Sequence, residues 1–252
     1  MENKVVISAR GITKKYKTQT AVDNLNFEVH EGEIFGFLGP NGAGKTTTLL
    51  MLMGLTHPSK GSAELFGLDP LRKPLEVKKL VGYLPENVGF YGDMTAIQSL
   101  QYVASLNGLR AGKLTTDEKI FELLELVGLT HELNKKVADF SRGMQQRLGI
   151  AEVLVKDPKI LFLDEPTLGL DPDGAIRLIE LISSLNRERN MTVVLSSHNL
   201  HQVQKLSKRV GIMIRGKMVA EGSIESLGRQ KLGFDENEYS LEEIYMKYFQ
   251  EV

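Results

Sequence analysis

Residues 39–47 constrain this chain more than any other stretch, because they read Gly-Pro-Asn-Gly-Ala-Gly-Lys-Thr-Thr. They fit the pattern of a phosphate-binding P-loop, in which a glycine and four further residues precede Gly-Lys-Ser/Thr. The glycines allow positive φ angles, so that backbone N–H groups can close around a phosphate. We expect Lys45 to reach the β and γ phosphates of a nucleotide and the Thr46 hydroxyl to bind Mg²⁺.

The flanking sequence supports this interpretation. Glu33–Leu38 reads as a buried strand that leads into the loop, and Thr47–Met53 as an apolar helix that ends before Gly54. A glycine-rich turn without a ligand is the alternative, but a strand before the motif and a helix after it favour nucleotide binding. The motif predicts these nucleotide-binding residues: Gly39, Pro40, Asn41, Gly42, Ala43, Gly44, Lys45, Thr46 and Thr47.

Composition narrows the classes of partner. The 252 residues suit one large domain, or a core with a small subdomain. With 31 basic and 32 acidic residues the net charge is −1, so we expect no nucleic-acid partner. The lack of cysteine excludes disulfides, thiolate metal sites and a cysteine nucleophile. No run approaches the ~20 apolar residues that span a bilayer, so any membrane part is expected from another chain.

The N-terminal third predicts an antiparallel layer beside the P-loop. Apolar and polar residues alternate in Val5–Ala9, Ile12–Tyr16 and Leu25–Val29, which is typical of strands with one solvated face. We expect a break at Gly11. Two further short strands are expected at Ala63–Gly67 and Val81–Leu84.

Helical periodicity dominates residues 88–156. Thr95 is predicted to cap a helix through Asn107, Thr116 to cap a second helix, and a third is expected at Arg142–Lys156. The apolar run Lys159–Leu163 is then typical of a central parallel strand. The remaining elements are expected as follows: helix Gly174–Arg189, strand Thr192–Ser196, helix Leu200–Ser207, hairpin Val210–Glu221, a loose polar connection over 228–239, and a helix opened by a capping box at Ser240–Glu243.

Together these patterns predict an α/β fold: a P-loop NTPase core with a mostly parallel sheet, an N-terminal antiparallel β-subdomain and an inserted α-helical subdomain. We expect a single domain over 1–252. Its core with the β-subdomain comprises 1–87 and 157–227, its helical subdomain 88–156, and its C-terminal extension 228–252.

Candidate catalytic residues follow two predicted strands. Asp164 and Glu165 lie at the C-terminal edge of an apolar strand, where α/β sheets place ligands. Asp164 is predicted to hold Mg²⁺ through water, and Glu165 to polarise the water that attacks phosphorus. The alternative is a pair that merely caps the loop before a proline. His198 follows the next strand and is predicted to hydrogen-bond the γ-phosphate. Its i, i+3 spacing from His201 is also found in metal sites, but no acidic or thiol partner accompanies the pair.

A second helix start carries small residues. Ser141 and Gly143 precede or open the helix at Arg142, where free N–H groups favour an anion. An ordinary N-cap is the alternative. One chain with two phosphate-binding helix starts suggests two chains that pair head to tail, each completing the other's site.

From residue 16 to residue 198 the chain resembles the ATP-binding subunits of ABC transporters. By this resemblance residues 160–165 correspond to the Walker B strand with its catalytic glutamate, and Leu170–Asp171 to the D-loop, so that Asp171 is expected near the nucleotide. His198 corresponds to the switch histidine. Tyr16 corresponds to the aromatic that stacks on adenine, with packing between strands as the alternative.

Two positions depart from the family pattern. The signature, commonly Leu-Ser-Gly-Gly-Gln, reads Phe-Ser-Arg-Gly-Met over 140–144, so that Ser141 and Gly143 are kept. Glu86 stands where the family often has glutamine, and its carboxylate is expected to bind Mg²⁺ or its water. In both departures the chain resembles the subgroup of ATP-binding subunits that serve separate membrane subunits of the ABC-2 type.

The resemblance implies an ATPase with ATP and Mg²⁺ as cofactors. It implies a homodimer in the ATP-bound state and an integral-membrane partner. The chain is expected to bind this partner as a peripheral subunit on the cytoplasmic face of the membrane. The function predicted is an ATP-driven transporter motor of exporter type. Two alternatives remain: a soluble ABC ATPase acting on ribosomes or nucleic acid, and a nucleotide-gated scaffold without turnover. Nothing in the sequence identifies a cargo.

Overall fold

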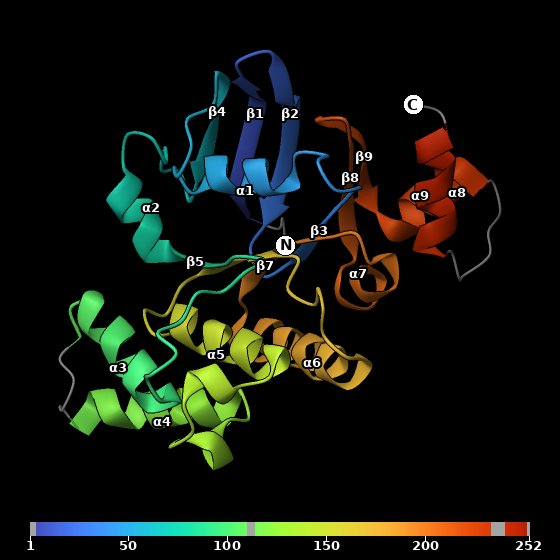
Figure 1. The fold of residues 1–252 in the computed structure, drawn as a ribbon. Coiled ribbons are helices and arrows are strands. Elements are labelled where there is room, and N and C mark those ends of the chain that lie inside the picture. Colours follow the sequence, from blue (N-terminus) through green and yellow to red (C-terminus); the bar gives the residue numbers. More distant parts are fainter. Residues whose placement is uncertain (1–3, 110–113, 233–239, 251–252) are drawn as a thin grey trace.

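The computed structural model describes residues 4–109, 114–232 and 240–250 (Figure 1). Its centre is a six-stranded sheet in the order β5-β6-β7-β3-β8-β9. The strands are parallel except for β9, which pairs antiparallel with β8 through the predicted turn at Arg215 and Gly216, where both φ angles are positive. Their bounds are Ile34–Leu38 (β3), Val81–Leu84 (β5), Ile160–Asp164 (β6), Thr192–Ser197 (β7), Arg209–Ile214 (β8) and Lys217–Ser223 (β9).

A second, antiparallel sheet in the order β2-β1-β4 confirms the predicted N-terminal layer. Its strands are Val5–Tyr16 (β1), Gln19–His30 (β2) and Lys60–Leu65 (β4). The predicted break at Gly11 is wrong, because β1 runs through it. Gly11 has φ +61 and lies where the pairing register shifts between Ala9 and Ile12, so the glycine forms a bulge and not an end.

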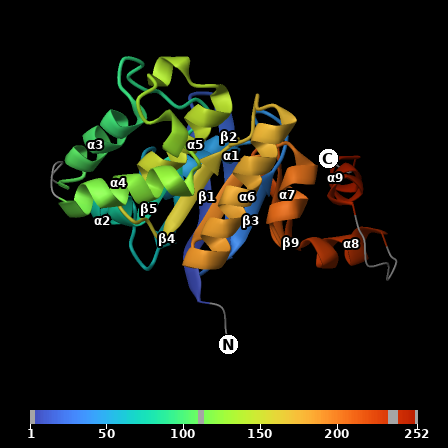
Figure 2. The same cartoon turned by 90° about the horizontal axis from the view of Figure 1, so that it is seen from below.

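The central sheet divides two apolar cores. Phe35 and Phe37 of β3 pack among the β1, β2 and α1 (Lys45–Leu52) residues, whereas Ile34 and Leu38 pack among the helices on the opposite face. This follows from the two-residue period of a strand. Helices α5 (Arg142–Leu154), α6 (Pro172–Arg189) and α7 (Leu200–Leu206) cover that second face (Figure 2). With both faces buried, the central strands read as continuous apolar runs.

The predicted helical region consists of α3 (Ala96–Leu106), α4 (Leu114–Leu126) and α5, with short 3₁₀ turns at Thr130–Glu132 and Val137–Asp139. Thr95 caps α3 through a capping box with Gln98. Thr116 does not cap α4, because the helix already begins at Leu114 and Thr116 is buried in its first turn. The division into subdomains stays a prediction.

Two helices lie outside the sequence prediction. α2 (Pro74–Leu80) buries only Val77, so it has almost no apolar periodicity. α8 (Ile224–Leu232) occupies part of the expected loose connection: 228–232 are helical, and 233–239 lie outside the described residues. Its polar residues form a solvated face with a Glu225–Arg229 ion pair at 2.5 Å, while Leu227 is buried.

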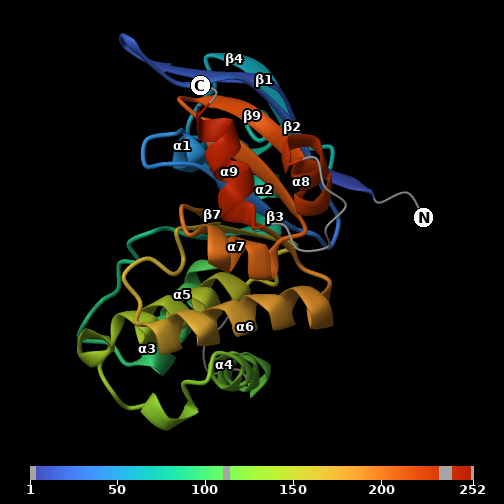
Figure 3. The same cartoon turned by 90° about the vertical axis from the view of Figure 1, so that its right-hand side faces the viewer.

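The C-terminal helix α9 (Leu241–Gln250) packs against α7 and α8 (Figure 3). The Ser240 hydroxyl accepts a hydrogen bond from the Glu242 N–H at its start. Among the described residues, none of the helices combines the length and apolarity needed to cross a membrane.

Glu152 joins α5 to α3 and leads to a prediction about pH. The Ser99 hydroxyl donates to Glu152 Oε1 at 2.6 Å, and burial raises the pKa of Glu152 to about 7, although this hydrogen bond lowers it. Between the unfolded pKa of about 4.3 and about 7, the unfolded chain ionises first, so the stability contributed by Glu152 falls as pH rises. Glu152→Gln keeps the acceptor and is expected to stabilise the fold by up to about 3 kcal/mol at pH 8 and not at pH 4.

Thermal or urea unfolding of both chains at pH 4 and pH 8 measures this difference. Glu122→Gln on the exposed face of α4 is the matched control and is expected to leave stability unchanged at both pH values. An equal effect of Glu152→Gln at the two pH values would contradict the prediction.

Candidate nucleotide-binding site

The loop after β3 has the backbone that the motif predicts. Gly42 and Gly44 have φ angles of +80° and +104°, which side-chain-bearing residues rarely adopt. A Cβ at Gly44 would also lie 2.5 Å from the Ala21 carbonyl oxygen. The loop ends where α1 begins at Lys45, so the first N–H groups of the helix face the same space.

This loop forms one wall of a cavity of about 310 Å³. Residues 40–47 line it together with Glu86, Glu165, Gln19 and Ala21. Sequence reasoning missed the last two, which lie at the start of β2 and belong to no motif. The hairpin between β1 and β2 therefore contributes to the same space as the P-loop.

Lys45 is buried and points back along its own loop. Its Nζ donates to the Gly39 carbonyl oxygen at 2.6 Å and lies 3.2 Å from Glu165 Oε1. The Glu165 oxygen is close enough for an ion pair but has no aligned hydrogen bond. The structure thus brings the predicted phosphate-binding cation and the predicted catalytic carboxylate together in a region of low exposure, where charge interactions are strong.

Asp164 ends β6 with a hydroxyl group on each carboxylate oxygen. The Ser196 hydroxyl of β7 donates to Oδ1, and the Tyr83 hydroxyl of β5 lies 3.5 Å from Oδ2. Burial and then the Asp164 charge raise the pKa of Tyr83 to about 12, so Tyr83 keeps its proton. Ser196 Oγ also accepts from the Glu165 N–H at 3.2 Å. Sequence reasoning missed Ser196 and Tyr83.

Glu165 and His198 meet across the ends of β6 and β7. Glu165 has φ +47°, a conformation uncommon for a side-chain-bearing residue and often found at functional sites. Its Oε2 lies 2.9 Å from His198 Nδ1 and accepts from the His198 N–H at 3.3 Å. The His198 side chain is half-exposed, so it can be reached from solvent.

Ser141, Gly143 and Asp171 do not line the cavity. The Ser141 hydroxyl caps α5 by accepting from the Met144 N–H at 3.3 Å, and Asp171 caps α6 in the same way. Ser141 is exposed, and the Arg142 guanidinium lies against Gly169. In this chain both caps therefore lie outside the space bounded by the P-loop.

Tyr16 also lies outside the cavity lining but beside it. It is 47% exposed, which argues against packing between strands, and it pairs in the β-hairpin with Gln19, which lines the cavity. The Lys14 ammonium lies 4.8 Å from the centre of its ring. An exposed ring at this edge is available for stacking.

A family model described as "ABC transporter" matches residues 22–168 of this chain. The chain belongs to this family. Among curated proteins, it is 44% identical to the bacitracin transport ATP-binding protein BcrA of Bacillus licheniformis, over 89% of this chain and 72% of that protein. It is 36% identical to the linearmycin resistance ATP-binding protein LnrL of Bacillus subtilis, over 86% of this chain and 69% of that protein.

Solved structures give the same answer. One described as the ATP-binding subunit of an ABC transporter has a TM-score of 0.84 and 27% identity, and the match covers 97% of this chain and 99% of that one. The predicted P-loop NTPase fold, ATP binding and transport-coupled ATPase function are confirmed. ABC ATP-binding proteins work with membrane transporter components, so the soluble alternative is not supported. The roles of individual residues stay predictions.

Proposed function

We propose that two copies of this ABC ATPase bind ATP between them, head to tail, and separate when it is hydrolysed. The observation that carries the proposal is the one-sided cavity: the P-loop lines it, while Ser141 and Gly143 of the same chain do not. Ser141 stands exposed at the start of α5, where free N–H groups attract an anion. A second copy would bring these groups to the γ-phosphate bound by the first.

The chemistry proposed for each residue follows from the geometry around the cavity. Lys45 would leave its loop carbonyl contact to bind the β and γ phosphates, which also frees Glu165 from its ion pair. Glu165 would then accept a proton from the attacking water. His198, held against Glu165, would donate to the γ-phosphate. Tyr16 would stack on adenine, and Asp171 would face the partner copy.

The residues predicted to bind Mg²⁺ fit that ion. Thr46 and Glu86 line the cavity, and the buried Asp164 ends β6 directly before the lining residue Glu165, so the set consists of oxygen donors. Bound there with the phosphates, Mg²⁺ would neutralise charge that develops on the leaving oxygens.

The transport role is proposed from the relatives. Their names refer to bacitracin transport and linearmycin resistance, and both describe an ATP-binding protein. From the resistance role of such a relative we infer transport out of the cell. We propose that this chain drives an integral-membrane subunit of the ABC-2 type, as a peripheral subunit on the cytoplasmic face. Purification from a detergent extract is expected to recover a polytopic membrane protein; recovery of ribosomes or DNA would contradict this role.

Gly143→Asp tests the head-to-tail site. A Cβ at Gly143 would meet other atoms only at 3.9 Å or more, so the monomer can accept the side chain. In the head-to-tail pair the new carboxylate would face the γ-phosphate, and like charges repel. In a hydrolysis-deficient Glu165→Gln background, Gly143→Asp is expected to abolish ATP-dependent dimers in size-exclusion chromatography while ATP binding to the monomer persists.

Glu76→Gln is the matched control for a charge change at an exposed helix start. Glu76 lies in the first turn of α2, where it pairs with Lys73, and this variant is expected to leave dimerisation intact. Dimers of normal stability with Gly143→Asp would place this residue away from the phosphate and contradict the proposed arrangement.

A further inference from the structure

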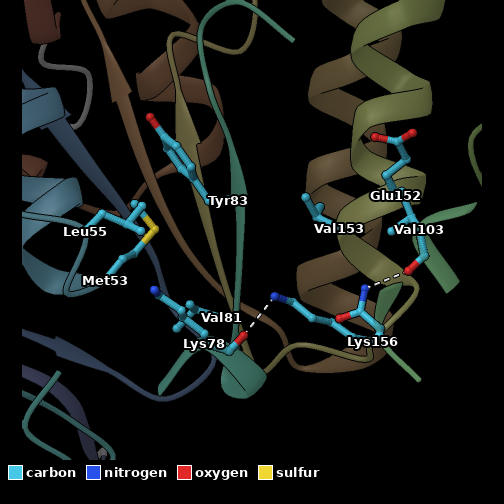
Figure 4. Close-up of a pocket in the computed structure, with 10 residues that line it drawn as sticks. Met53, Leu55, Lys78, Val81, Tyr83, Val103, Glu152, Val153 and Lys156 are labelled. Atoms are coloured by element: carbon cyan, nitrogen blue, oxygen red, sulfur yellow. Dashed lines mark hydrogen bonds between the residues drawn. The ribbon is translucent and has the colours of Figure 1, made fainter. Parts of the chain in front are cut away.

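A second cavity lies beside β5, the edge strand of the central sheet next to β6. It has a volume of about 280 Å³ and is bounded by the end of α1, α2, β5, α3 and α5 (Figure 4). Met53, Val81, Val103 and Val153 make much of it apolar. It shares no lining residue with the nucleotide-binding cavity.

Tyr83 contacts both the second cavity and Asp164. Its ring is part of the wall of the second cavity, and its hydroxyl points away from Glu152 and Val153 (Figure 4). The β5–β6 register places Tyr83 opposite Phe162, two residues before Asp164, and the hydroxyl reaches to 3.5 Å from Asp164 Oδ2. The Tyr83 side chain therefore contacts both the second cavity and a predicted ligand of Mg²⁺.

The two residues whose hydroxyls contact Asp164 differ in burial and in the space around their side chains. Ser196 is fully buried inside the parallel sheet, whereas Tyr83 is half-buried with a cavity beside its ring. The distance of 3.5 Å is long for an O–H···O bond, whose usual value is about 2.7–2.8 Å. Bringing the two oxygens to the usual value needs a movement of about 0.7 Å (3.5 minus 2.8 Å), whereas an outward movement of the ring would lose the contact. The Ser196 hydroxyl contacts the other carboxylate oxygen, Oδ1.

We propose that Tyr83 is a positioning residue, whose hydroxyl orients Asp164 toward Mg²⁺ and whose ring transmits to Asp164 the filling or closing of the second cavity. The inference rests on the proposed role of Asp164. A purely structural Tyr83 would pack its ring and contribute nothing through its hydroxyl.

Tyr83→Phe separates these roles, because it keeps the ring and removes only the hydroxyl. Binding of a fluorescent ATP analogue is titrated with Mg²⁺. We expect the half-saturating Mg²⁺ concentration to rise about 10-fold, the lower end of the effect of losing a hydrogen bond to a metal ligand. Nucleotide binding without Mg²⁺ and the unfolding temperature are expected to stay unchanged. Tyr102→Phe, which removes an exposed hydroxyl from α3, is the matched control.

The link to the cavity is tested by partly filling it. Val103→Phe on α3 is expected to shift the half-saturating Mg²⁺ concentration about two-fold or more, and this shift is expected to vanish in the Tyr83→Phe background. Val103→Leu is used in the same cycle if the larger side chain lowers the unfolding temperature.

Unchanged Mg²⁺ dependence in Tyr83→Phe, or additive shifts in the double variant, would overturn the inference. The failure is distinguishable from failure of the proposed function. If Glu165→Gln still forms ATP-dependent dimers while Tyr83→Phe behaves as the original chain, only the role of Tyr83 is lost.

Discussion

Glu165→Gln is expected to slow ATP hydrolysis at least ~100-fold while ATP binding persists. The amide has the size of the carboxylate but cannot take a proton from water. Its place is fixed by the backbone, because the Glu165 N–H donates to Ser196 and the residue holds its positive φ angle at the end of β6. The change therefore removes the base and leaves the geometry. Phosphate release at saturating ATP measures the rate, and nucleotide titration measures binding.

The same variant is expected to accumulate as a dimer when ATP is added, since the bound triphosphate is no longer cut. Size-exclusion chromatography with ATP, with ADP and without nucleotide shows this. Glu242→Gln, at the exposed start of α9, is the matched control and is expected to hydrolyse ATP normally and to show no trapped dimer. Hydrolysis by Glu165→Gln at the original rate, or a monomer in every condition, would contradict the role given to Glu165.

The elements around the P-loop cavity were predictable because the sequence patterns that specify them are local. The P-loop reads as consecutive residues, and β3 and β6 read as apolar runs because the sheet covers both of their faces. The carboxyl ends of parallel strands meet at one edge, so Asp164, Glu165 and His198 could be placed together from their positions after two strands.

Ser196 and Tyr83 could not be predicted in the same way. Their contacts with Asp164 exist because β6 lies between β5 and β7, and strand order depends on crossovers between distant segments. A serine within an apolar strand carries no signal of its partner. The same holds for Gln19, which lines the nucleotide cavity because tertiary packing brings the start of β2 beside the P-loop.

The errors in helix assignment have a related cause. In α8 the apolar side is narrow and Leu227 is one of few buried side chains, so tertiary packing decides the helix. Thr116 looked like a cap because threonine accepts N–H groups well, but α4 starts two residues earlier. The presence of one good capping residue does not by itself show at which residue the helix begins.

Lys45→Ala is expected to weaken ATP binding by at least about 30-fold, because truncating one member of a buried charge pair costs about 2–5 kcal/mol. The Lys45 ammonium is buried at the P-loop cavity, and no other described lysine or arginine lines it. Equilibrium titration with a fluorescent nucleotide measures the loss. Lys79→Ala, at an exposed position in the last turn of α2, is the control and is expected to change affinity far less.

Lys45→Ala also has a consequence without nucleotide. Its Nζ lies 3.2 Å from the buried Glu165 Oε1, so its removal leaves a carboxylate without its cation and is expected to destabilise the fold by about 3 kcal/mol. Glu165→Gln in the same chain removes the uncompensated charge and is expected to restore much of the stability but none of the ATP affinity. Urea unfolding of the single and double variants separates the two roles. Unchanged nucleotide binding in Lys45→Ala would refute the role of Lys45 in ATP binding. Equal stability of Lys45→Ala and of the double variant would refute its role in compensating the Glu165 charge.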